Sequence, residues 1–271
     1  MDYAFTIVFI CGGGYDYFHE ILENNIHVLC DNTKESYDLV MFLDGIDNYD
    51  YEPYIKLAKK CHIDEVILRS RKNNCASGDP SNNAHMHGFS TKTKYLVTIE
   101  SDVAIFKIQK DFDILHQIRK TFEMNQNLHL LTRIDDYECW KEKLVFMPKN
   151  LCKGIYSVNR VSSHFLIYDT HRCRKIFEKS LYSLYEFYDD ENEWYNYEDM
   201  ISKLFIYPKG PGIGFLDSFP IRVFHCDEKK YPGSAFYKRD TVTKLRVFEQ
   251  RKWETLDLRN LYEVRSINND E

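Results

Sequence analysis

An acidic triplet, Glu100-Ser101-Asp102, directly follows the apolar segment 95–99. Two carboxylates that are separated by one residue can hold the same hard cation, and Mg²⁺ or Mn²⁺ bound in this way keeps coordination positions open for the phosphate oxygens of a substrate. His225 follows another apolar segment, 221–224, and its neutral imidazole could supply a third ligand. The alternatives to a metal site are a solvated turn after a strand and a histidine with a structural role.

A second acidic pair, Glu198-Asp199, stands at the start of a segment that we expect to be helical. The helix dipole favours carboxylates at that position, so a simple cap is one interpretation and a general base is the other. Trp194 and Tyr197 lie just before or beside the pair, and aromatic faces can stack on a sugar ring, although core packing is their usual role. His164 lies in a polar segment, 160–164, that we expect to border the acceptor.

The elements that must position these residues alternate between strands and helices. Segment 4–10 is short and almost continuously apolar, which is typical of a strand buried on both faces, and a glycine-rich turn follows it. Alternation of this kind predicts a mostly parallel, Rossmann-like α/β sheet flanked by helices. The expected strands are 4–10, 37–43, 65–69, 95–99, 128–133, 163–168 and 221–224, and the expected helices are 15–24, 52–60, 84–91, 112–124, 171–185 and 198–205. We expect 135–154 to be irregular and 208–214 to be a turn.

The carboxyl ends of parallel strands meet at one edge of a sheet, where open α/β proteins bind their ligands. Asp44 closes the second expected strand, and Arg71 follows the third, so both are candidates for contact with a nucleotide or its phosphates. The run Gly12-Gly13-Gly14 resembles part of a dinucleotide fingerprint. That fingerprint needs a further glycine where Asp16 or Tyr17 stands, so an oxidoreductase is disfavoured.

Composition narrows the class of protein. The 271 residues carry a net charge of −6 and are 44% hydrophobic, which excludes intrinsic disorder and is not typical of a nucleic-acid coat protein. No apolar run approaches the length of about 18 residues that a membrane span needs, and the first ten residues lack a signal-peptide pattern, so we expect a cytoplasmic protein. The eight cysteines form no CxxC pair, which favours reduced, structural thiols.

Taken in order over residues 4–228, these motifs resemble the layout of GT-A-fold glycosyltransferases, family 2-like. The resemblance implies that the loop after the first strand and the acidic residue after the second hold the nucleotide, and that the DxD-type motif holds Mn²⁺ or Mg²⁺ and the diphosphate. It also implies that Asp199 is the base and that Glu198 orients its neighbours. The first metal-motif residue here is Glu100 and not Asp, which leaves Asp102 as the safer ligand. The resulting assignment is Cys11, Gly12, Gly13, Asp44, Arg71, Asn83 and Ser101 for the donor, Glu100, Asp102 and His225 for the metal, and Trp194, Tyr197 and His164 for the acceptor.

We therefore expect a GT-A-like domain over residues 1–232, with a C-terminal extension, 233–271, packed on it. The expected activity is metal-dependent, inverting transfer of a sugar from a nucleotide sugar, such as a UDP-sugar, to an acceptor hydroxyl. The acceptor stays open between a glycan, a small molecule and a modified DNA base. The alternatives are a sugar nucleotidyltransferase, which usually has a basic residue in the loop that 11–17 lacks, and a glycan- or nucleotide-binding module without turnover.

Overall fold

The computed structural model describes residues 3–11, 15–45, 52–70, 91–133, 135, 146–152, 155–158, 164–174, 212–216 and 219–225. The helices are α1 Tyr15–Cys30, α2 Glu52–Lys60 and α4 Ile114–Met124. The strands are β1 Phe5–Cys11, β2 Tyr37–Gly45, β3 Glu65–Ser70, β4 Tyr95–Glu100, β5 Val103–Lys107, β6 Leu128–Thr132, β7 Phe146–Cys152, β8 Ile155–Val158, β9 Phe165–Asp169, β10 Gly212–Phe215 and β11 Ile221–His225.

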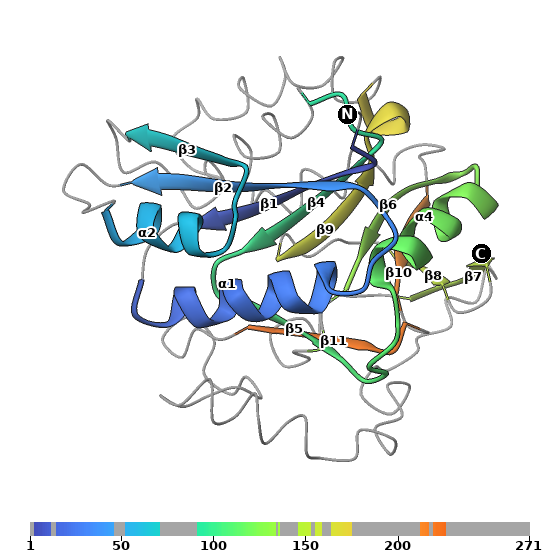
Figure 1. Ribbon diagram of the computed structural model, residues 1–271. Helices are drawn as coiled ribbons and strands as arrows, with labels where there is room; N and C mark the ends of the chain where they lie inside the picture. Colours follow the sequence, from blue (N-terminus) through green and yellow to red (C-terminus); the bar gives the residue numbers. More distant parts are fainter. Residues whose placement is uncertain are drawn as a thin grey trace, which may run out of the picture.

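Nine strands form one sheet in the order β3-β2-β1-β4-β9-β6-β10-β8-β7, and β5 pairs with β11 in a separate two-stranded sheet (Figure 1). Strands β3, β2, β1 and β4 are parallel to one another, and β6 is parallel to β10. The strands β9 and β8 run against their neighbours. Seven of the nine strands therefore run in the same direction, and the mostly parallel α/β sheet with flanking helices that the sequence predicts is confirmed.

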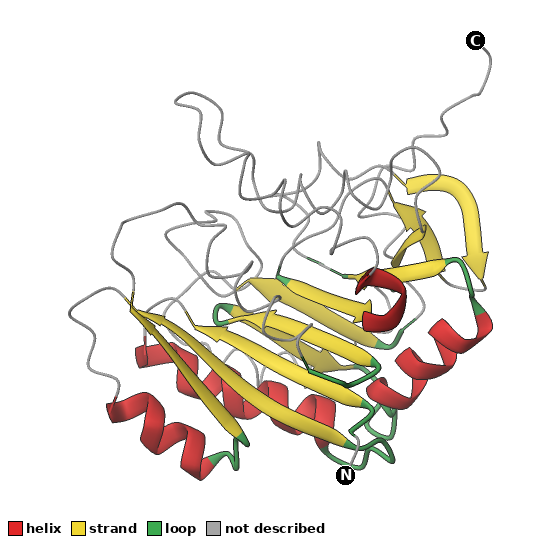
Figure 2. Cartoon of the chain, turned by 90° about the horizontal axis from the view of Figure 1, so that it is seen from above, coloured by secondary structure: helices red, strands yellow, loops and turns green. Residues whose placement is uncertain are grey.

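The central strands are buried on both faces. Phe5, Ile7 and Phe9 of β1 belong to the core that α1, α2 and α4 cover, and Figure 2 shows these three helices along one face of the sheet. Val8, on the other face of β1, and its register partner Thr98 of β4 are also fully buried. Burial on both faces explains why these strands are continuously apolar in sequence.

Helix α1 ends where Asn32 adopts a φ of 65°. This left-handed conformation is costly for most residues but is tolerated by asparagine, and it commonly terminates helices. Helix α4 begins after Asp113, whose side chain accepts a hydrogen bond from the backbone N–H of His116 at 3.1 Å. Local capping therefore sets the limits of two of the helices that cover the core.

The described residues do not include 84–90 of the expected helix 84–91, the expected helix 198–205, most of 171–185 or the extension 233–271. Two other expectations are wrong in part. Strand β7 occupies much of the segment 135–154 that we expected to be irregular, and β10 overlaps the turn expected at 208–214. Both strands carry residues that are unfavourable in sheets: Pro148 in β7, which is an edge strand, and two glycines in β10.

Candidate functional site

The carboxyl ends of β1, β2, β3 and β4 meet at one edge of the sheet. The register pairs Cys11 with Leu43, and Ile10 with Glu100, so β1 and β4 end within one residue of each other and β2 extends two residues further. Asp44 lies one residue beyond Leu43 in β2. Because β1 separates β2 from β4, the backbones at Asp44 and Glu100 are roughly 10 Å apart.

Glu100 is joined at this edge by His164. Strand β9 runs antiparallel to β4, so the residue that precedes β9 lies at the carboxyl end of β4. The backbone N–H of Glu100 donates to the carbonyl of His164 at 3.1 Å, and His164 Nε2 lies 3.5 Å from Glu100 Oε2. The buried His164 is thus placed against the acidic triplet, while its predicted contact with an acceptor stays a prediction.

Asp102 and His225 come together through the two-stranded sheet. Asp102 directly precedes β5, and the antiparallel register pairs Val103, the first residue of β5, with His225, the last residue of β11. The two backbones are therefore neighbours, although His225 comes 123 positions after Asp102 in the sequence. Asp102 is only 8% exposed, so its carboxylate belongs to the interior of this edge.

The metal-ligating groups beside Asp102 are of the kinds that bind Mg²⁺ or Mn²⁺. Glu100 and Asp102 supply carboxylate oxygens, and the backbone places the imidazole-bearing residue His225 beside them. Among the residues whose side chains the structure describes, no group of three His, Cys, Asp or Glu is arranged to hold a metal ion. Magnesium sites often use one or two carboxylates and complete their shell with water and substrate phosphates, so two carboxylates at the carboxyl edge of the sheet fit such an ion.

Two asparagines of α1 fix the position of β5. Asn25 is 1% exposed; its Nδ2 donates to the carbonyl of Val103 at 2.7 Å, and its Oδ1 accepts from the backbone N–H of Ile105 at 2.9 Å. Asn24 Nδ2 donates to the carbonyl of Ile105 at 2.9 Å. These bonds satisfy backbone groups on the side of β5 that faces away from β11, and they begin one residue after Asp102. Helix α1 therefore holds the strand that starts at the acidic triplet.

We expect Asn25→Ala to destabilise the protein by about 2–4 kcal/mol, because it leaves two buried backbone groups without partners. The midpoint of urea unfolding measures this effect, provided that the slope of the transition is unchanged. Asn24→Ala is the matched control, because it removes one bond to β5 at a half-buried position and should cost less. Equal stability of the two variants would show that Asn25 does not hold β5.

The outer side of β11 is held in turn by a buried ion pair. Arg133, at the end of β6, is fully buried and donates through Nε and Nη2 to Asp135 at 2.7 and 2.9 Å. Asp135 accepts the backbone N–H of Val223 at 2.8 Å, and its own N–H donates to the Val223 carbonyl at 2.7 Å. Strands β5 and β11 are thus anchored from both sides, and with them the positions of Asp102 and His225.

Only some of the remaining predicted site residues are among the residues that the structure describes. Cys11 is buried, its thiol lies 3.8 Å from the Phe9 carbonyl, and burial raises its pKa well above the ordinary value, so the side chain is a neutral thiol. Ser101 lies in the turn between Glu100 and Asp102. The backbone places Asp44 at the edge described above. The others lie outside the described residues: Gly12, Gly13, Arg71, Asn83, Trp194, Tyr197, Glu198 and Asp199.

The sequence analysis did not select the two asparagines of α1 or the Arg133–Asp135 pair as candidates. The sequence nevertheless contains features that point to Asn25 and Arg133. Asn25 stands seven residues after Phe18, on the apolar stripe of α1 that also includes Ile21 and Leu22. A polar residue on such a stripe is expected to have a specific partner. Arg133 follows the apolar strand β6 in the same way that Glu100 closes β4.

The described thiols Cys11, Cys30, Cys61 and Cys173 are free, in agreement with the expectation of reduced cysteines. Burial raises the pKa of Cys30 to about 12, so it too is protonated at neutral pH. None of the described helices is long and apolar enough to cross a membrane.

No family model matches the sequence, and no curated protein is similar to it. Among solved structures, TarS residues 1–349 from S. aureus, in complex with UDP-GlcNAc, matches at a TM-score of 0.48 and 13% identity over 82% of this chain and 57% of that fragment. The mannosyltransferase PcManGT from Pyrobaculum calidifontis, in complex with GDP-Man and Mn²⁺, matches at 0.47 and 11% over 80% of this chain and 57% of PcManGT. The 4-diphosphocytidyl-2C-methyl-D-erythritol synthase from Anaerococcus prevotii matches at 0.45 and 13% over 92% of this chain and 99% of that enzyme. The chain thus spans less than two thirds of the length of TarS and PcManGT.

Proposed function

We propose that this protein is a metal-dependent, inverting glycosyltransferase that uses a nucleotide sugar as its donor. The observation that carries the proposal is the placement of Glu100 and Asp102 at the carboxyl edge of the sheet, with the end of β11 directly beside Asp102. Carboxylates at this edge are suited to a cation that is shared with a diphosphate.

A second carboxylate-bearing residue, Asp44, lies along the same edge and would bind another part of the donor. Asp44 is the last residue but one of β2, two strands away from Glu100, and the roughly 10 Å between them is suited to a nucleoside at one end and its phosphates at the other. Asp44 is the residue that accepts a hydrogen bond from the ribose or the base. His164 borders Glu100 and limits the freedom of its carboxylate.

A divalent cation, when bound, would neutralise the negative charge that develops on the leaving diphosphate. Glu100 and Asp102 would hold it, with His225 as the additional ligand. On the other face of the sugar, the acceptor hydroxyl must lose a proton as it attacks, and Asp199 would take it. A single displacement of this kind inverts the configuration at the sugar carbon.

Thermal unfolding in the presence of individual nucleotide sugars, with and without Mn²⁺, tests the proposal. A ligand that binds the native state alone raises its stability, so the true donor should raise the melting temperature, and more strongly with Mn²⁺. UDP-sugars and GDP-sugars form the first panel. If none of them stabilises the protein in the presence of Mn²⁺ or Mg²⁺, the donor class is wrong.

Assays of turnover separate the proposed transferase from the alternative functions. A sugar nucleotidyltransferase would release pyrophosphate from a nucleoside triphosphate and a sugar phosphate. A binding module would be stabilised by its ligand but would neither hydrolyse nor transfer the sugar. Turnover of a nucleotide sugar with Mn²⁺, at a rate above that of the uncatalysed reaction, supports the transferase.

We expect Asp44→Ala to raise the KM for the donor by about tenfold, which is the loss of one good hydrogen bond, while kcat at saturating donor changes little. The contact is made equally in the ground state and the transition state, which is why it appears in KM. Asp111→Ala, at an exposed position, is the control for the loss of one negative charge. A fall in kcat without a change in donor affinity would place Asp44 in the chemical step instead.

A further inference from the structure

The Arg133–Asp135 pair stands at the same edge of the sheet as the acidic triplet. Strands β4 and β6 both run against β9, and the two registers place Thr98 of β4 and Thr132 of β6 opposite the same residue, Leu166. Arg133 directly follows β6 and is therefore level with the last residues of β4. The two strands are two spacings apart, so the pair lies roughly 10 Å from the end of β4.

This one ion pair holds both β11 and the segment that leads into it. Asp135 Oδ2 accepts Arg133 Nε at 2.7 Å and the backbone N–H of Val223 at 2.8 Å. Arg133 Nη1 donates to the carbonyls of Leu216 and Phe219, the second at 3.0 Å, which lie between β10 and β11. The side chains of Arg133 and Asp135 are 0% and 1% exposed, so these contacts are made away from water.

Asp135 acts on β11 close to the proposed metal ligand. Its carboxylate and its own N–H bond to both backbone groups of Val223, which is two residues before His225. The register places His225 opposite Val103, the residue after Asp102. Because side chains alternate along a strand, a slip of β11 by one residue would move the His225 side chain to the other face of the two-stranded sheet.

Stability alone is a weak reason to bury such a pair. The cost of removing two charges from water offsets most of their attraction, and apolar side chains of similar volume often stabilise a protein as well or better. A geometric requirement is a better account of Asp135, because its two bonds to Val223 specify where β11 lies.

We propose that Asp135, held by Arg133, is a positioning residue for the metal, and that it gives the site a preference for Mn²⁺ over Mg²⁺. It does so by keeping His225 beside Asp102. The inference rests on the proposed function, because it assumes a cation at the acidic triplet. Imidazole nitrogen is a ligand for transition metals, whereas Mg²⁺ takes oxygen ligands and keeps several waters. A contact that places the histidine should therefore matter more for Mn²⁺ than for Mg²⁺.

Titration of the protein with Mn²⁺, followed by the electron paramagnetic resonance of the free ion, and competition by Mg²⁺ give the two affinities. Asp135→Asn should weaken Mn²⁺ binding about tenfold or more, which is the usual effect of losing a residue that orients a metal ligand. The affinity for Mg²⁺ should change much less, so the ratio of the two affinities falls. A general loosening of the site would weaken both ions equally and leave the ratio unchanged.

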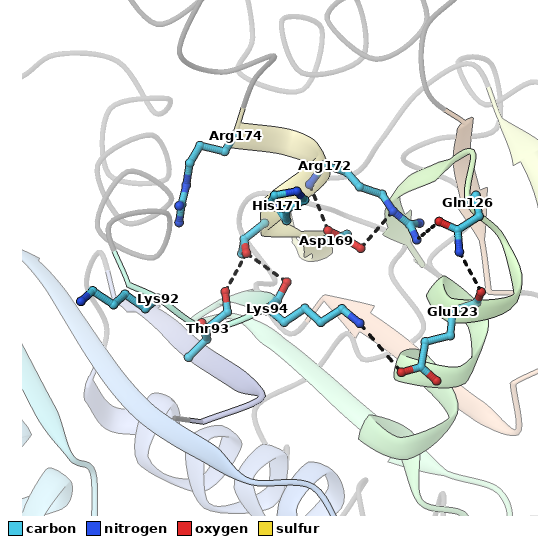
Figure 3. Close-up of a pocket in the computed structure, with 10 residues that line it drawn as sticks. Lys92, Thr93, Lys94, Glu123, Gln126, Asp169, His171, Arg172 and Arg174 are labelled. Carbon is cyan, nitrogen blue, oxygen red and sulfur yellow. Dashed lines mark hydrogen bonds and ion pairs between the residues drawn. The ribbon is translucent and has the colours of Figure 1, made fainter. Parts of the chain in front are cut away.

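Asp169→Asn is the matched control, because it makes the same change in a buried aspartate at the opposite edge of the sheet. Asp169 is 2% exposed, accepts the backbone N–H of Arg172 at 3.0 Å and lies 3.1 Å from Arg172 Nε, beside the hollow that Figure 3 shows. This variant should lose stability and keep the wild-type ratio of Mn²⁺ to Mg²⁺ affinity. Urea midpoints of the two variants measure the loss of stability in each.

A second substitution tests whether Asp135 acts through His225. His225→Ala should itself lower the preference for Mn²⁺, and Asp135→Asn should lower it no further in the His225→Ala background. Such a double-mutant cycle separates an effect that passes through His225 from an independent one. If Asp135→Asn does not fold, Arg133→Met/Asp135→Leu replaces the pair by apolar side chains, a change that buried ion pairs often tolerate, and should show the same loss of preference.

Four results would overturn the inference and leave the proposed function standing. They are a wild-type protein that binds both ions without preference for Mn²⁺, an unchanged affinity ratio in the folded variants of the pair, an equal fall of the ratio in Asp169→Asn, and a full effect of Asp135→Asn in the His225→Ala background. A wild-type protein that binds neither Mn²⁺ nor Mg²⁺ would instead contradict the proposed metal-dependent function, and this inference with it.

Discussion

Asp102→Asn should abolish divalent-dependent donor binding and leave the fold intact. The asparagine side chain has nearly the same shape as the aspartate but lacks its charge, and Asp102 is placed at the carboxyl edge beside the last residue of β11. A divalent cation stabilises the developing charge by several kcal/mol, and each 1.4 kcal/mol is worth about tenfold in rate, so transfer should fall by about 10²–10³-fold. Calorimetry with Mn²⁺ and the nucleotide sugar measures the loss of binding directly.

Two companion variants make this result specific. Asp111→Asn changes the charge equally at an exposed position and should retain metal and donor binding. Glu100→Gln should show a weaker defect than Asp102→Asn, because Glu100 also faces His164 Nε2 at 3.5 Å and is the less typical residue of its motif. Unchanged affinity of the Asp102→Asn variant for Mn²⁺ and donor would remove Asp102 from the metal site.

Much of the sheet could be predicted because its strands are buried on both faces. The segments that became β1, β2 and β4 are continuously apolar, and each ends at a polar residue or a glycine loop, so the sequence marks both their type and their limits. The alternation with helices then favours parallel neighbours. In these strands the local pattern and the tertiary environment agree.

The strands that could not be predicted are those that depend on distant partners. Strand β5 is five residues long, and its edges are satisfied by Asn24 and Asn25 of α1 on one side and by β11 on the other. Strand β10 is four residues with two glycines, and it is supported by β6 and β8. The apolar residues of β5 are typical of a strand but do not identify its partners, and the glycines of β10 are unfavourable in a strand until its partners are in place.

The candidate site was predictable in its parts but not in its arrangement. The positions of Glu100 and Asp102 after an apolar strand pointed to the carboxyl edge, and the ordering of motifs suggested a ligand from far along the chain. Only the antiparallel register of β5 and β11 brings His225 next to Asp102. That register depends on the Arg133–Asp135 pair, which anchors β11 at Val223 and has no counterpart in local sequence patterns.

Substitution of Asp199, in the second acidic pair, should lower the rate of sugar transfer without changing donor or metal binding. Asp199→Asn should lose about 10²–10⁴-fold in transfer rate, which is the usual contribution of a general base, while metal and donor bind as before. Asp199 lies outside the described residues, and its assignment rests on the order of the motifs: the metal pair comes first, and Glu198-Asp199 follows almost a hundred residues later. Single-turnover transfer at saturating donor isolates the chemical step.

Glu198→Gln is the matched variant, because it removes a charge from the neighbouring position. It should perturb binding or stability at least as much as rate, since we assign Glu198 to orientation. The anomeric configuration of the product, read by NMR, gives an independent check: a single displacement with Asp199 as base inverts the donor configuration and leaves no sugar on the enzyme. Retention of configuration, or near wild-type transfer by the Asp199→Asn variant, would contradict this mechanism and require a different base or a covalent intermediate.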